Sequence, residues 1–194
     1  MTIRTTLIAT TALLALAGCG RNQDNASTYT TNGADTVNQA DTTAPASTQT
    51  ATTSAAQSFA NTAAASDAFE IATSQLALTN GASASVKSFA RKMIEAHETS
   101  TAKLKTLTAG MTPALTPNPA LNAEQQQTLD RLKGLNGKAF DEAYIAGQTA
   151  GHQQTLDALK AYATTGDAPQ LNTFATDLIP TVTAHLNMAK GLKA

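Results

Sequence analysis

Three histidines and one glutamate are the side chains of this sequence whose types and spacing could do chemistry. His97, His152 and His185 are the only histidines, and each lies near the middle of the apolar stripe of a predicted helix when successive residues are placed about 100° apart. Glu70 lies in the middle of the stripe of another helix, where an unpaired carboxylate is costly to bury. Because the middles of antiparallel helices coincide, we expect the four side chains to meet in one interior layer.

Two interpretations of this layer remain open. In the first, Glu70 pairs with one or more imidazoles in a hydrogen-bonded polar layer that satisfies the carboxylate and sets the helix register. In the second, the four side chains bind one divalent transition metal ion, because three imidazoles and a carboxylate suit Zn, Fe, Mn or Cu. The sequence favours the first interpretation, since polar groups in protein cores are often only structural.

The elements that must position these residues are helices, because the chain has helical periodicity and no strand-like alternation of any length. Short connections make the first and second long helices, and the third and fourth, antiparallel neighbours. A Pro-rich crossover that contains a short extra helix joins the second to the third. The sequence therefore predicts an all-α protein, an antiparallel four-helix bundle over residues 58–194. The expected long helices are at residues 58–79, 85–109, 138–164 and 169–190, and the short one is at 123–133.

Residues with capping side chains stand at the predicted starts of three helices. Ser83 or Ser85 can cap the second long helix, and Asn136 can cap the third. Asn122 followed by Gln125 is the pattern of a capping box, in which each side chain bonds the backbone N–H of the other residue. These local signals support the predicted bounds.

The segment at the N-terminus is typical of a secretory signal. Arg4 precedes an apolar run that is shorter than the roughly 20 residues needed to span a bilayer. The only cysteine, Cys19, follows Leu-Ala-Gly, which resembles the lipobox of bacterial lipoproteins. That resemblance implies a signal peptide at residues 1–18, a lipid on Cys19 and a mature chain that begins there. Gly20, in place of the Asp that favours inner-membrane retention, implies an outer-membrane lipoprotein that faces the periplasm.

The segment that follows, residues 19–57, is rich in Thr, Ala, Asn and Ser and nearly lacks large apolar residues. Such a segment cannot bury enough apolar surface to offset its ordering entropy, so we expect a disordered tether. The formal net charge of the whole chain is −1, which offers no support for binding to nucleic acid. The expected partner is the membrane, through the lipid anchor, and the sequence names no protein partner.

Short motifs stand on all four long helices. They are Phe69-Glu70-Ile71 with Leu76-Ala77-Leu78, Phe89 through His97, Phe140-Asp141-Glu142-Ala143-Tyr144 with Gly151-His152, and Leu178-Ile179-Pro180-Thr181 with His185-Leu186. Together they resemble one family of bacterial exported proteins, the ferritin-like family labelled domain of unknown function 4142. The resemblance covers nearly the whole chain after the tether, and it implies a ferritin-like bundle. Ala96 departs from the Asp that usually precedes the histidine of the second helix, which would remove a hydrogen-bonding partner of His97.

Motifs of catalysis are missing from the sequence. There is no Gly-rich phosphate loop, no G-x-S-x-G elbow and no H-E-x-x-H zinc motif. Di-iron sites in helical bundles use Glu-x-x-His on two helices, whereas Ile94, Thr149 and Val182 stand three residues before the histidines. With Glu70 as the only carboxylate expected in the layer, ferritin chemistry is not predicted.

The sequence thus predicts a non-enzymatic, lipid-anchored envelope protein with a structural or interaction role. The alternative is a mononuclear metal-binding or stress-related envelope protein that uses the Glu70, His97, His152 and His185 core site.

Overall fold

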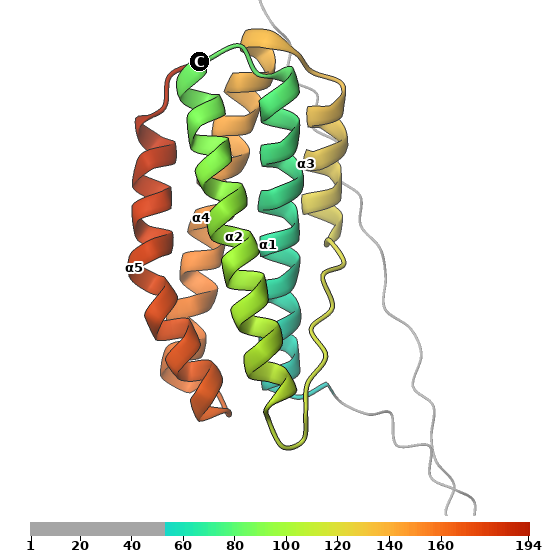
Figure 1. Cartoon of the computed structure of the whole chain (residues 1–194), viewed down its shortest axis with the longest axis vertical. Coiled ribbons are helices and arrows are strands. Elements are labelled where there is room, and N and C mark those ends of the chain that lie inside the picture. Colours follow the sequence, from blue (N-terminus) through green and yellow to red (C-terminus); the bar gives the residue numbers. More distant parts are fainter. Residues whose placement is uncertain (1–52) are drawn as a thin grey trace, which may run out of the picture. The chain divides into compact units, whose positions relative to one another are not determined.

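The described part of the chain, residues 53–194 of a computed structural model, is a bundle of five helices and contains no extended strand (Figure 1). The two closely packed helix pairs are α1 with α2 and α4 with α5, and α3 lies against α1 and α4. The all-α prediction is confirmed. The helices are α1 (Ala55–Asn80), α2 (Ala84–Ala109), α3 (Ala123–Lys133), α4 (Gly137–Thr165) and α5 (Pro169–Gly191).

Several predictions concern residues outside this description: the signal peptide at 1–18, the lipidated Cys19 and the tether as far as residue 52. The last residues of the expected tether are helical, because α1 begins at Ala55 rather than at residue 58. Ser54 caps this start, and its hydroxyl accepts a hydrogen bond from the backbone N–H of Gln57 at 3.1 Å. None of the described helices has the combination of length and hydropathy that a membrane span requires.

The capping prediction is confirmed for α3 and is wrong for α2 and α4: Asn136 precedes α4, but its side chain makes no capping hydrogen bond. Asn122 and Gln125 form the complete capping box at the start of α3. Ser83 precedes α2, but its side chain makes no capping hydrogen bond. The carboxylate of Asp141, on α4, instead accepts hydrogen bonds from the backbone N–H groups of Ala82 and Ser83, the latter at 2.8 Å. The start of α2 is therefore attached to α4 by a contact from across the bundle.

The interior consists of two apolar clusters with a polar layer between them. One cluster contains Phe59, Leu104 and Leu159, and the other contains Phe89 and Phe140. Buried polar side chains stand between the residues of one cluster and those of the other on three helices: Ser66 through Ser74 on α1, His97 on α2, and Gln148 and His152 on α4. The polar layer is thus enclosed by apolar side chains above and below, which lowers the dielectric around it and strengthens the electrostatic interactions within it.

Candidate metal centre

Three imidazoles from three helices converge inside the polar layer. His97 of α2, His152 of α4 and His185 of α5 each offer a ring nitrogen, and these three atoms lie within 4.8 Å of one another. The ring centroids are 5.7 Å apart for His97 and His152, 5.7 Å for His97 and His185, and 5.4 Å for His152 and His185. All three are buried, with exposed fractions of 6 %, 1 % and 8 % respectively. We call these residues the three-histidine cluster.

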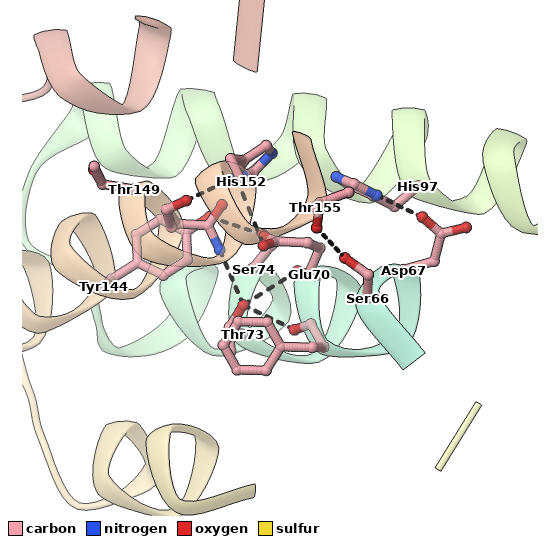
Figure 2. Close-up of polar contacts among 12 residues, drawn as sticks. Ser66, Asp67, Glu70, Thr73, Ser74, His97, Tyr144, Thr149, His152 and Thr155 are labelled. Carbon is pink, nitrogen blue, oxygen red and sulfur yellow. Dashed lines mark hydrogen bonds and ion pairs between the residues drawn. The ribbon is translucent and has the colours of Figure 1, made fainter. Parts of the chain in front are cut away.

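His97 is oriented by a carboxylate that the sequence analysis overlooked. Its Nδ1 lies 2.8 Å from Oδ1 of Asp67 (Figure 2). The hydroxyl of Thr101 donates to the other oxygen of Asp67 at 3.1 Å. With Nδ1–H donated to the carboxylate, Nε2 faces the cluster, where it is buried without a hydrogen-bond partner. Two carboxylates therefore reach the layer rather than Glu70 alone, and Asp67 supplies the partner that Ala96 cannot. The sequence does contain a signal for this second carboxylate, because Asp67 lies three residues before Glu70, on the same helix face.

His152 is oriented by the backbone of its own helix. Its Nδ1–H donates to the carbonyl oxygen of Gln148 at 2.8 Å, one turn earlier. Since Nδ1 carries the proton, Nε2 keeps its lone pair, and this atom is also buried without a partner.

The electrostatics of the layer keep two of the three imidazoles neutral. Burial, with the charges of His97 and His185, lowers the pKa of His152 to about 3, although the hydrogen bond to Gln148 opposes the shift. Burial and the charge of His97 lower the pKa of His185 to about 4. Burial acts the same way on His97, but the hydrogen bond to Asp67 and the nearby carboxylate charges outweigh it and raise its pKa. His152 and His185 therefore keep lone pairs at neutral pH.

Glu70 lies beside the three-histidine cluster and does not belong to it. Its Oε1 is 3.6 Å from Nδ1 of His152, the nitrogen already used for the backbone bond. The side chain is 1 % exposed and neither oxygen has a hydrogen-bond partner. Burial raises the pKa of Glu70 to about 7, although the charge of His97 opposes this. The four residues expected in one layer are thus near one another, but the carboxylate stands behind His152 rather than among the donor nitrogens.

Hydrogen bonds between α1 and α4 hold this arrangement in place. Ser74 and Tyr144 share a buried hydrogen bond of 2.7 Å between their hydroxyls, and the Gln148 amide donates to the Thr73 hydroxyl at 3.1 Å (Figure 2). Gly151 lets the two helices approach at Glu70, because a Cβ at this position would lie 3.0 Å from Oε1. Tyr144 belongs to a motif quoted above, but its partner Ser74 does not, so the sequence analysis did not predict the hydrogen bond between them.

Comparison with known proteins bears on both the family and the fold. The family model described as "Domain of unknown function (DUF4142)" matches residues 41–192. The chain belongs to this family. The prediction made from its motifs is therefore confirmed. No curated protein matches the chain.

Among the solved structures similar to this DUF4142 chain are three of CopM. They include "CopM in the Cu(II)-bound form", with 20 % identity, a TM-score of 0.59, and coverage of 70 % of this chain and 93 % of CopM. "CopM in the Cu(I)-bound form" has 21 % identity and a TM-score of 0.58, covering 70 % and 92 %. The Ag-bound form has 23 % identity and a TM-score of 0.54, with the same coverage as the Cu(I) form. At these identities the similarity shows a shared helical fold.

The donor atoms of this DUF4142 chain fit a single metal ion. Three nitrogens within 4.8 Å of one another leave a point within about 2.8 Å of all three, so ligand distances of about 2.0–2.1 Å need movements of less than about 1 Å. Nε2 of His97, Nε2 of His152 and Nδ1 of His185 are all buried without a hydrogen-bond partner. A self-sufficient polar layer would pair these atoms with one another, and they are not so paired in the structure.

Proposed function

We propose that this protein binds one copper ion through His97, His152 and His185. Two observations carry the proposal: each of the three buried histidines brings a ring nitrogen within 4.8 Å of the other two, and each ring has a buried nitrogen without a hydrogen-bond partner. Buried polar atoms in folded proteins are nearly always paired. Three ring nitrogens that lack hydrogen-bond partners are suited to a shared metal ion, which would displace any proton held on His97, so the cluster supports the metal-binding alternative over the structural role that the sequence favoured.

The chemistry of the donors supports copper among the candidate metals. Imidazole suits Zn, Cu, Fe and Ni, and copper binds most tightly among the divalent ions of the first row. His152 and His185 are neutral at pH 7, as metal ligands must be. Asp67 accepts from the far nitrogen of His97, an arrangement that orients a metal-binding imidazole and raises its basicity. The likeness to copper-bound and silver-bound CopM adds support from the fold.

The test is metal binding by untagged protein in a Cys19→Ser background, because a free thiolate would itself bind copper. We expect one copper per chain in titrations followed by elemental analysis, and a melting temperature that rises with copper. The His97→Ala, His152→Ala double variant should lose both effects, and Gln153→Ala, an exposed neighbour of His152, should lose neither. Equal copper retention by the double variant would refute the site, and a strict preference for zinc would refute the choice of metal.

The location of the protein is part of the same proposal. A lipid on Cys19 and a tether would hold the bundle at the outer membrane, in the periplasm, where copper is less tightly buffered by thiols than in the cytosol. In cell fractionation, the protein that retains Cys19 should sediment with membranes, and the Cys19→Ser variant should be released into the soluble fraction. A Cys19→Ser protein that stays with the membrane would contradict the lipid anchor.

A further inference from the structure

A surface groove of about 430 Å³ lies along the seam between α2 and α5. Beneath it is a smaller cavity of about 50 Å³, whose walls include Asp67, His97 and His185. The two spaces share part of their lining, namely Ala96, Ser100, Leu178, Thr181 and His185. His185 therefore lines both spaces, and the groove is the side from which the three-histidine cluster lies nearest to solvent.

This seam is the weakly closed side of the bundle. Helices α2 and α5 pack much less extensively than α1 with α2 or α4 with α5. Side chains of the described residues form no hydrogen bond between α2 and α5. Ala96, Ser100 and Thr181, which line both spaces, are small. Between the groove and the cavity, few large side chains would therefore have to move to admit an ion.

Met188 is placed where such an ion would first meet the protein. It lines the groove, and with 37 % exposure it is the one large hydrophobic side chain exposed among residues 53–194. It follows His185 by three residues on α5, so the two side chains share a helix face. A thioether is a soft donor that selects Cu(I) over hard or borderline cations. A solvent-exposed thioether beside an unpartnered imidazole is thus a pair of donors suited to Cu(I).

The charges on the groove act in the same direction. Lys92 and Lys103 line it together with a single anion, Glu95. An excess of positive charge repels a divalent cation more strongly than a monovalent one. The surface charge therefore disfavours capture of a divalent ion more than capture of a monovalent one.

We propose that Met188 and His185 form an outer capture site for Cu(I), from which the ion moves to the three-histidine cluster through the α2–α5 seam. This inference rests on the proposed function. The transfer is an exchange of ligands: the Met188 thioether leaves the ion as the nitrogens of His97 and His152 bind it. The oxidation state of the metal does not change.

Ag(I), a monovalent soft ion that does not undergo redox chemistry under these conditions, is the probe. For NMR, the Cys19→Ser chain is labelled with ¹³C at the methionine methyl groups and at the histidine rings. The Met188 and His152 resonances are assigned by their absence in Met188→Leu and His152→Ala. We expect the Met188 methyl to shift in the presence of substoichiometric Ag(I). The shift should persist in His152→Ala, because His152 does not line the groove.

Loading kinetics give the second measurement. Transfer of Cu(I) from a chromophoric chelator should be slowed roughly tenfold in Met188→Leu, the size of effect that loss of a supporting ligand has at metal sites, with the final stoichiometry unchanged. Met111→Leu, a half-buried methionine outside the groove, should load as the parent does.

The outcomes separate the two proposals. If the His152 ring resonances respond to Ag(I) while the Met188 methyl does not, or if Met188→Leu loads at the parent rate, the capture site is refuted and the three-histidine site stands. If neither the histidine nor the methionine resonances respond, the proposed function fails, and the capture site fails with it.

Discussion

Nδ1 of His97 lies 2.8 Å from Oδ1 of Asp67, and this pair connects α2 to α1 at the level of the three-histidine cluster. Both side chains are buried. The contact decides which nitrogen of His97 faces the other two imidazoles, because a ring that donates from Nδ1 presents the lone pair of Nε2. Asp67 is thus a positioning residue for the proposed metal ligand.

Removal of the Asp67 carboxylate should weaken copper binding without abolishing it. Asp67→Ala leaves His97 without its partner, so we expect the copper Kd to rise roughly 10- to 100-fold, as is found for residues that orient metal-binding histidines. Asp67→Asn keeps a carbonyl acceptor and should lose less affinity than Asp67→Ala. The exposed Asp157→Asn is the matched control, and its Kd should equal that of the parent. An unchanged Kd in Asp67→Ala would contradict a positioning role.

The pH dependence of stability should report the buried carboxyl of Glu70. In the folded state its pKa is about 7, against an ordinary value of 4.5, so the metal-free folded protein holds a proton that the unfolded chain releases between these values. Its contribution to the free energy of unfolding therefore falls as the pH rises from 4.5 to 7, in total by about 3 kcal/mol. His152 and His185, whose pKa values are lowered, contribute the opposite slope below pH 6.5.

Glu70→Gln isolates the Glu70 contribution. The free energy of unfolding of the variant, relative to that of the parent, should increase steadily from pH 4.5 to pH 7 in urea titrations with a chelator present. Glu98→Gln, on the exposed face of α2, is the control and should follow the parent at every pH. A difference between Glu70→Gln and the parent that does not vary with pH would show that the carboxyl is not buried as described.

Two glycines of α4 should respond oppositely to the same substitution. Gly151→Ala places a Cβ 3.0 Å from Oε1 of Glu70, and such overpacking costs about 1–3 kcal/mol. Gly147→Ala meets only the methyl group of Thr128, at 3.4 Å, so it should gain the roughly 0.5–1 kcal/mol by which alanine exceeds glycine in a helix. Urea unfolding midpoints measure both effects. Equal midpoints for the two variants would mean that Glu70 does not approach α4 at Gly151.

The cap that α4 provides for α2 should be a strong local contact. Asp141→Ala leaves the backbone N–H groups of Ala82 and Ser83 without their acceptor, and loss of hydrogen bonds to a charged group costs about 1.5–3 kcal/mol. Hydrogen exchange should become faster in the first turn of α2 more than elsewhere. Asp130→Ala removes an exposed carboxylate of α3 and should leave the exchange of α2 unchanged. Uniform acceleration across the bundle would argue against a capping role.

The helices themselves could be predicted from local signals. The predicted bounds of the short helix at residues 123–133 agree with α3, because Asn122 and Gln125 act within one turn of chain. Pro169 likewise begins α5, as a residue favoured in a first turn. The error at α1 also has a local cause, since the Ser54 cap lies in a segment whose composition resembles the tether.

The sequence by itself determined which face of each helix carries His97, His152 and His185, because a period of 3.6 residues sets the direction of a side chain relative to its own helix. Only the tertiary structure decided that Asp67 rather than Glu70 bonds His97, and that Glu70 lies behind His152. The physical reason is one of scale. Hydrogen bonds and metal–ligand bonds are sensitive to a few tenths of an ångström, whereas the periodicity of a sequence leaves the rotation and sliding of one helix against another open by a large part of a turn. Side-chain packing between helices removes that freedom.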